Sequence, residues 1–195
     1  EFIGGKADDG VNIKFSKINL NNNIFKNNFA DQIDLDYCKG FVRDSSFLYE
    51  TKGDNNGDGL DISGSQIYAS GNLFRNFKDK GVSVGEKSQI FITKNNFKQN
   101  EVASAVKDFS NAYYWENYFS KNLRDIQVYQ KKKIYGGGRI FLKKEERERL
   151  MASLDKRSKV FFFPIGIEKN NPWILNIPES LTKFFNQLEV IEFNE

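Results

Sequence analysis

The sequence predicts an all-β solenoid, in which short parallel strands wind into coils that stack along one axis. The first observation is a set of alternating apolar residues that returns every 22 residues, apart from one step of 27 that absorbs a polar insertion at 51–57. A repeat of this length is typical of solenoid architectures. The paired positions are Val11/Ile13, Ile33/Leu35, Leu60/Ile62, Val82/Val84, Ser104/Val106 and Ile126/Val128, where Ser104 replaces the first apolar residue of its repeat.

The second observation is a ladder of phenylalanines in the same register. Its members are Phe25, Phe47, Phe74, Phe97 and Phe119, and most lie in an Asn-x-Phe frame formed by Asn23, Asn72, Asn95 and Asn117, with Ser45 before Phe47. We expect the rings to stack inside the coil. We expect the asparagine amides to bond their copies on neighbouring coils and to satisfy backbone groups of the turns.

Each repeat begins with a strand, because its apolar residues alternate with a period of two. A second apolar pair and the Asn-x-Phe element supply two more short strands, and a polar or glycine-containing turn ends the unit. One such coil cannot bury its inward face alone and needs its neighbours. The Leu-x-x-Leu-x-Leu frame of leucine-rich repeats is absent from the sequence. We therefore predict a parallel β-helix of about six rungs over residues 1–142.

The chain changes character after residue 142. The charge-rich segment 143–159 predicts a helix, 160–167 a strand, 178–188 a short helix and 189–193 a last strand. Solenoids need caps that protect their open ends. Residues 143–195 are therefore interpreted as a small α/β cap or docking segment.

Composition excludes several classes of function. The net charge is only +3 and Lys131–Lys133 lacks interleaved aromatic residues, so no nucleic-acid partner is predicted. The chain has no histidine, which excludes histidine triads and histidine metal sites, and its single cysteine, Cys38, excludes an internal disulfide. No apolar run approaches the ~20 residues of a membrane span. Because the chain opens at Glu1 without methionine, we expect a processed or excised piece.

The outward positions of the first strand form columns across the rungs. They concentrate Asp34, Asp36 and Asp61 on adjacent rungs, with Lys80 and Lys107 one or two rungs later. Carboxylates stacked ~5 Å apart repel each other, and a hard divalent cation, Ca²⁺ first, is the natural compensator. The lysines can hold the carboxylates of an anionic polymer. The alternative is a solvated face whose aspartates and lysines pair across rungs.

Further polar residues lie at equivalent positions of successive rungs, but their identities differ from rung to rung. This variation favours a binding site over a surface without function. The predicted substrate-binding residues are Ser63, Ser65, Ser83, Glu86, Lys87, Asp108, Tyr129 and Lys131. The insertion 54–59 resembles part of a calcium loop. It has Ser63 where an EF-hand requires glutamate, so a turn without an ion is the simpler interpretation.

The units Asp-Gly-Leu-Asp-Ile-Ser-Gly-Ser (58–65) and Lys-Gly-Val-Ser-Val-Gly-Glu-Lys-Ser (80–88), together with the Asn-x-Phe turns, resemble the right-handed parallel β-helix repeats of the pectin-lyase-like superfamily. The resemblance covers about residues 6–142 and implies a right-handed coil and an extracellular or cell-surface location. Likeness to its pectate-lyase-type members implies calcium on Asp34, Asp36 and Asp61. It also implies that Lys107 or Lys80 abstracts the proton α to a uronate carboxylate.

The chain departs from that pattern because no clear arginine lies on this face. Glycoside-hydrolase members of the superfamily instead imply a carboxylate pair, Asp34/Asp61 or Asp61/Glu86, so Asp61 is catalytic in that interpretation. Two hypotheses follow. One is a lyase or epimerase type of protein that acts on or binds an acidic polysaccharide. The other is a non-catalytic surface or assembly module that binds glycan or a partner protein, with its C-terminal segment docking. The first requires Asp34, Asp61 and Lys107 to converge.

Overall fold

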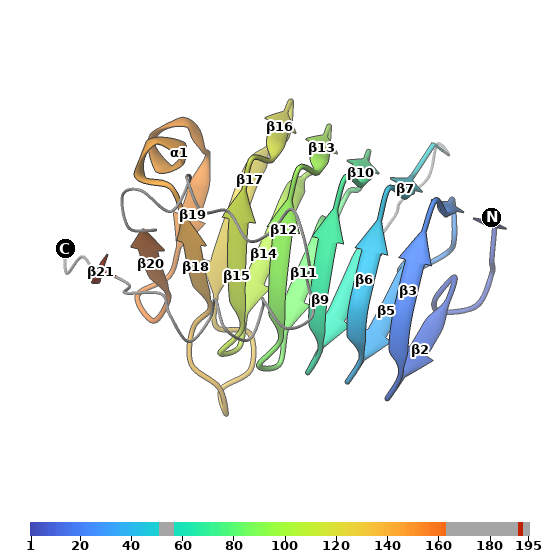
Figure 1. Cartoon of the computed structure of the whole chain (residues 1–195), viewed down its shortest axis with the longest axis horizontal. Coiled ribbons are helices and arrows are strands. Elements are labelled where there is room, and N and C mark those ends of the chain that lie inside the picture. Colours follow the sequence, from blue (N-terminus) through green and yellow to red (C-terminus); the bar gives the residue numbers. More distant parts are fainter. Residues whose placement is uncertain (51–56, 163–190, 193–195) are drawn as a thin grey trace.

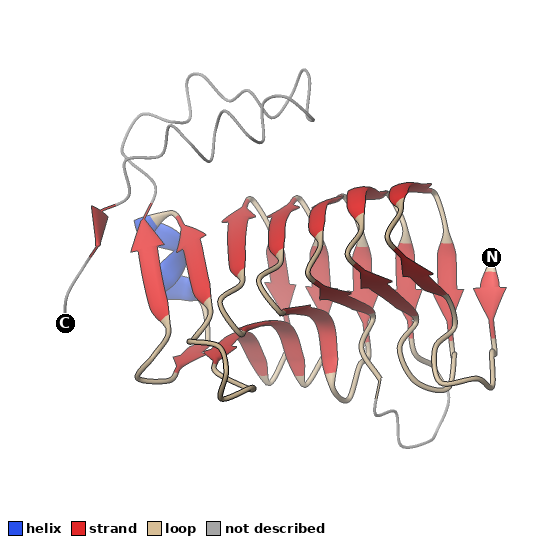
Figure 2. Ribbon diagram, turned by 90° about the horizontal axis from the view of Figure 1, so that it is seen from below, coloured by secondary structure: helices blue, strands red, loops and turns tan. Residues whose placement is uncertain are grey.

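The computed structural model describes residues 1–50, 57–162 and 191–192, and it shows a three-sided parallel solenoid (Figure 1). Three sheets run along its length, and the chain passes from one to the next in each coil (Figure 2). This confirms the predicted all-β solenoid. The three sheets have six, seven and eight strands.

Sheet A is the narrowest side and has six parallel strands. In order along the axis these are β1 (Phe2–Ile3), β4 (Ile24–Lys26), β7 (Ser46–Leu48), β10 (Leu73–Arg75), β13 (Asn96–Lys98) and β16 (Tyr118–Ser120).

Sheet B has seven parallel strands and carries the outward columns predicted from the sequence. They are β2 (Asn12–Lys14), β5 (Ile33–Asp36), β8 (Leu60–Ser63), β11 (Lys80–Gly85), β14 (Val102–Lys107), β17 (Arg124–Tyr129) and β19 (Ala152–Leu154).

Sheet C has eight strands, of which only the last is antiparallel to its neighbour. They are β3 (Lys17–Asn21), β6 (Lys39–Arg43), β9 (Gln66–Ser70), β12 (Gln89–Thr93), β15 (Asn111–Trp115), β18 (Arg139–Leu142), β20 (Lys159–Phe162) and β21 (Ile191–Glu192).

The predicted phenylalanine ladder forms the centre of the core. Phe25, Phe47, Phe74 and Phe97 are fully buried, and consecutive rings stack with centroids 4.7–5.1 Å apart. Phe119 continues the stack at one end. Offset stacking of this kind adds to the free energy gained by burying each ring.

The predicted asparagine frame also forms as expected. The Asn72 amide donates to Asn95 Oδ1 at 2.9 Å and to the Val42 carbonyl at 2.8 Å, and Asn95 repeats this pattern with Asn117. Ser45 takes the asparagine's place, since its Oγ accepts a hydrogen bond from the Asn23 N–H. These bonds satisfy backbone groups that the turn leaves unpaired.

The solenoid continues past the boundary expected at residue 142. β19 pairs in parallel with β17, and β20 with β18, so residues 152–162 add strands to sheets B and C. The helix expected over 143–159 is confined to α1 (Lys144–Arg149). The strand expected at 160–167 overlaps β20, whereas β19 lies within the segment expected to be helical, and its outward residue, Ser153, is polar. The helix expected at 178–188 lies outside the described residues.

Candidate functional site

The candidate site lies on the outer side of sheet B, where β5 and β8 begin. Ile33 and Leu35 are buried in the core, so Asp34 and Asp36 between and after them point outward and are half-buried. The predicted outward column is in register, because Asp34 pairs with Asp61 and Asp61 with Ser83. Residues distant in sequence therefore become neighbours on one face.

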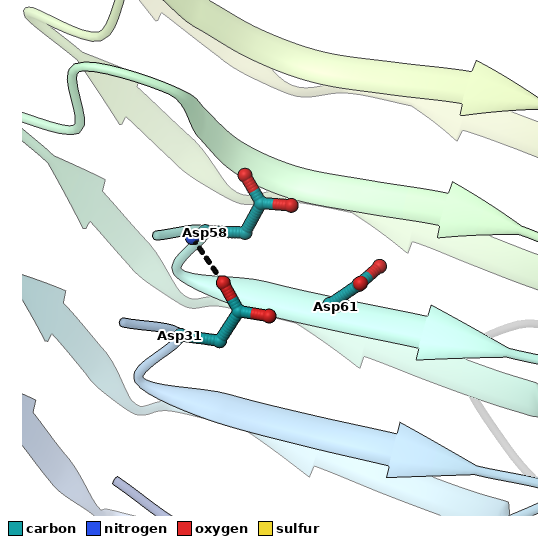
Figure 3. A group of neighbouring side chains, drawn as sticks. All are labelled: Asp31, Asp58 and Asp61. Carbon is teal, nitrogen blue, oxygen red and sulfur yellow. Dashed lines mark hydrogen bonds between the residues drawn. The ribbon is translucent and has the colours of Figure 1, made fainter. Parts of the chain in front are cut away.

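Three carboxylates gather at this edge of the sheet. Asp31 and Asp58 lie in the turns that lead into β5 and β8, and Asp61 is the second residue of β8 (Figure 3). One oxygen from each lies within 4.8 Å of the others. We call Asp31, Asp58 and Asp61 the acidic trio.

Backbone donors hold two members of the trio in place. Asp31 Oδ1 accepts a hydrogen bond of 2.6 Å from the Asp58 N–H, and Asp58 Oδ1 accepts one of 3.1 Å from the Lys80 N–H (the first is dashed in Figure 3). Asp61 differs. Its Oδ1 is buried and accepts no hydrogen bond from any residue of the described chain. An unpaired buried carboxylate oxygen is costly, so this atom needs a partner.

The trio is electrostatically unfavourable without a counter-charge. Burial, with the charges of Asp61, Asp9 and Asp34 adding to it, raises the pKa of Asp31 to about 7. Burial is also the main cause that raises the pKa of Asp58 to about 7, although the Lys80 ammonium opposes this shift. Near neutral pH the group must therefore keep protons or bind a cation.

Lys80 serves as an ion-pair partner. Its ammonium lies 3.0 Å from Asp58 and 2.6 Å from Asp79. Burial lowers its pKa, but the two carboxylates outweigh burial and raise it above its ordinary value. A lysine held in its protonated form cannot accept a proton, which argues against the catalytic base role expected for Lys80.

Lys107 reaches back toward the trio. It is 6% exposed, and its Nζ donates a 2.7 Å hydrogen bond to Ser83 Oγ. Ser83 is the in-register neighbour of Asp61, so the ammonium lies beside the next rung along from the trio. Among the described residues, Lys107 has no carboxylate within ion-pair distance. The expected convergence of Lys107 with Asp61 stays a prediction, because the Lys107 ammonium bonds Ser83 on the next rung and not the Asp61 carboxylate.

The metal ligands expected from the sequence overlap the trio only at Asp61. Asp34 accepts a 2.7 Å hydrogen bond from the Asn12 amide, and Asp36 is paired with Lys14 at 2.7 Å. Burial, with the charges of Asp36 and Asp61, still raises the pKa of Asp34 to about 6. It therefore adds to the negative potential of the face without belonging to the cluster.

Sequence reasoning missed Asp31 as a ligand and considered Asp58 only as part of the calcium-loop fragment. The available signal was the position two residues before the first inward residue of each rung, which Asp9, Asp31 and Asp58 occupy in succession. Residues 51–56 of the insertion lie outside the described residues.

Two predicted binding residues have structural roles instead. Ser65 is buried at a corner, where its Oγ accepts from the Cys38 N–H and donates to the Leu35 carbonyl. Asp108 is fully buried, and its Oδ1 accepts from the N–H groups of Lys131 and Lys132. These hydrogen bonds support turns, although Asp108 Oδ2, like Asp61 Oδ1, is buried and has no hydrogen-bond donor within the described chain.

Apart from Ser83, which is fully buried, the remaining predicted binding residues stay on the surface. Ser63 and Tyr129 are half-buried at the ends of β8 and β17, and Lys87 and Lys131 are exposed. Glu86 is paired with Lys132. The structure spreads these residues along several rungs and does not bring them to the trio.

A comparison with protein families decides the fold family. The family model described as the right handed beta helix region matches residues 7–140. The chain belongs to this family. No curated protein and no solved structure matches this β-helix protein. Within its described residues, no helix has both the length and the apolar character needed to cross a membrane.

Proposed function

We propose that this β-helix protein binds an acidic, uronate-containing polysaccharide on the outer side of sheet B, with a divalent cation held by the acidic trio. The observation that carries the proposal is the gathering of three carboxylates from two neighbouring rungs, one of them with a buried oxygen that lacks a hydrogen-bond donor. Such polymers occur outside cells, so an extracellular or cell-surface setting is part of the proposal.

The spacing of the trio suits a calcium ion. Calcium binds oxygen ligands at about 2.3–2.6 Å, so two ligands of one ion can lie up to ~5 Å apart. The three oxygens lie within 4.8 Å of one another and meet this limit. A cation would also offset the burial and the lesser charge repulsion that together raise the pKa of Asp31 and Asp58.

The polysaccharide would supply further oxygen ligands to the calcium ion. Calcium takes 6–8 oxygens, more than three monodentate carboxylates supply, so uronate carboxylates and water can complete the shell. Lys107 adds a second attraction, because a buried ammonium without a described carboxylate partner is stabilised by an anion nearby. A cation and an ammonium one rung apart match a polymer that carries a charge on each sugar.

The test is binding of polygalacturonate and alginate, measured by calorimetry with calcium and again with EDTA. We expect calcium-dependent binding by the native protein and its loss in Asp61→Asn. Asp36→Asn is the matched control, because Asp36 lies on the same face but outside the trio, and it should retain the calcium response. Equal binding in calcium and EDTA by all three proteins would contradict the proposed cation.

A lyase or epimerase reaction is the second candidate, and the position of Lys107 favours it. Its Nζ donates a hydrogen bond to Ser83, which is one rung from Asp61. A base at this position would be next to a uronate bound at the trio. A lyase would release unsaturated uronates that absorb in the ultraviolet, and an epimerase would exchange the α proton with deuterated water. If polymer binds and neither signal appears, the protein is a binding module.

A further inference from the structure

A pair of exposed aromatic side chains lies at the corner between sheets B and C. Phe15 follows the end of β2 and Tyr37 the end of β5. Their rings are stacked with centroids 5.0 Å apart and planes within 4°. The two residues are 76% and 55% exposed. Large aromatic residues normally bury their rings, so this pair needs an explanation.

The backbone makes the pair more unusual. Phe15 and Tyr37 have φ of 50° and 54°, a left-handed conformation that bulky residues rarely adopt. The other non-glycine residues with positive φ in the described chain are polar, apart from Phe109. Gly64 occupies the next rung of the same corner at φ 60°. A bulky exposed ring in a strained position points to a role other than folding.

The geometry leaves ring surface open to a ligand. Ring atoms in contact lie about 3.5–4 Å apart, so a centroid separation of 5.0 Å between nearly parallel rings means that they are offset. Tyr37 lies over Gly64, since a Cβ at residue 64 would be 2.6 Å from Tyr37 Cδ1. The Tyr37 ring therefore lies between the Phe15 ring and the corner glycine, and the outer face of Phe15 and the exposed edge of Tyr37 form a stepped platform.

Charged side chains border the platform on both sides. On the sheet B side, Lys14 and Asp36 form an ion pair at 2.7 Å. On the sheet C side, Lys17 and Lys39 are exposed and in register on neighbouring rungs. Among the described residues, neither of these two lysines takes part in an ion pair. An aromatic surface bordered by free ammonium groups suits a ring that carries a carboxylate.

A protein partner fits this surface less well. Two aromatic side chains bury about 300–500 Å² at most, whereas a stable interface buries about 800 Å² on each partner. The bordering lysines are also the residue type that interface cores avoid. The platform and the acidic trio lie at opposite edges of sheet B, because Phe15 and Tyr37 follow β2 and β5 whereas Asp31 and Asp58 precede β5 and β8, so a polymer that crosses this face can contact both.

We propose that Phe15 and Tyr37 form a sugar-binding platform, on which a uronate ring stacks through its C–H face while Lys17 and Lys39 bind its carboxylate. This inference rests on the proposed binding of acidic polysaccharide and adds a subsite to it.

The test uses oligogalacturonate in calorimetry with the native protein and with the double variant Phe15→Asn/Tyr37→Asn. Asparagine tolerates positive φ, so this variant should melt at the native temperature or above it. We expect its Kd to rise at least ~5-fold, because the aromatic surface that the sugar contacts is lost. The calcium dependence of the melting temperature should not change, because the trio is intact.

Two single variants serve as controls. Tyr37→Phe keeps the ring and should bind within about twofold of the native protein. Tyr118→Asn removes a tyrosine that is 63% exposed on sheet A, away from the platform, and should also bind normally.

Three results would overturn the proposal, for different reasons. If the double variant binds as tightly as the native protein while Asp61→Asn does not bind, the platform is wrong and the proposed function stands. If the native protein binds neither polygalacturonate nor alginate, the proposed function fails together with the platform. If sedimentation shows native self-association that the double variant loses, the occupant is a second copy of the chain.

Discussion

The outer side of sheet B changes along the solenoid while its inner side does not. On β5 and β8 the outward column holds Asp34 and Asp61, which are partly exposed. On β11 and β14 the same column holds Ser83 and Ala105, which are fully buried. The inward neighbours on all four strands are apolar or small and buried.

This difference shows where function can reside in a repeat fold. Inward residues must fit their copies on adjacent rungs, so stacking restricts them to one shape per column. Outward residues have no such restriction. The outward carboxylates of sheet B lie on β5 and β8, and the exposed Phe15 and Tyr37 follow β2 and β5, so this end of the solenoid is where we place ligand binding.

Removing a ring from the inner ladder should have the largest effect. Phe74→Ala should lower the free energy of unfolding by about 3–5 kcal/mol, because Phe74 is fully buried between Phe47 and Phe97. The exposed Tyr118→Ala should change it by less than ~0.5 kcal/mol. Denaturant unfolding measures both. If Phe74→Ala lowers the free energy of unfolding by less than ~1 kcal/mol, stacking does not restrict the inward residues as described.

Breaking the ion pair of Lys80 should have the next largest effect. At pH 8, Lys80→Met should cost about 2–3 kcal/mol, because it leaves the Asp58 carboxylate buried without its cation. The cost should shrink at pH 5, where Asp58 can take up a proton. Lys132→Met, which breaks an exposed pair with Glu86, should cost less than ~1 kcal/mol. Equal losses in the two variants would remove the distinction between buried and exposed pairs.

The pH dependence of stability should reveal the trio. The folded-state pKa of Asp31, about 7, lies above its ordinary value of 3.8, so its contribution is fully present below pH 4 and is lost as pH rises to about 7. In EDTA, Asp31→Asn should therefore be more stable than the native protein by about 1–2 kcal/mol at pH 8, and not at pH 4. Parallel pH profiles for the two proteins would show that Asp31 titrates normally.

The smallest effect expected is at the corner glycine beside the platform. Gly64→Ala should cost about 1 kcal/mol, because φ is +60° and the new Cβ would contact the Tyr37 ring. Gly71→Ala, at the corner between sheets C and A with φ +67°, should cost a similar amount. Only Gly64→Ala should also weaken binding of oligogalacturonate. If both variants bind normally, the position of the Tyr37 ring does not matter.

Most of the fold could be predicted from the sequence, because stacking imposes a period that is visible in the chain. The phenylalanine ladder, the asparagine frame and the register of the outward columns all follow from this repeat. The strand β19 could not be predicted in the same way, and the strand expected at 160–167, which overlaps β20, could not be assigned to the solenoid. Their rung lacks the Asn-x-Phe element, and α1 precedes it in the chain.

The site was less predictable, because it depends on how the corners turn. The strand pattern gives the direction of Asp61, but not that Asp31 and Asp58 approach it from the preceding turns. The direction of Ser65 is likewise set by the corner, which points its hydroxyl inward to the Leu35 carbonyl. The protonation of Lys80 depends on its contact with Asp58, which the spacing alone does not show.

A thermal melt at pH 8 with calcium and then with EDTA, on the native protein and on Asp31→Asn/Asp61→Asn, tests the acidic trio most directly. We predict that calcium raises the melting temperature of the native protein and leaves that of the double variant unchanged, because ligand binding stabilises only a fold that has the site. No calcium response in the native protein, or the same response in both proteins, would contradict a cation at Asp31, Asp58 and Asp61.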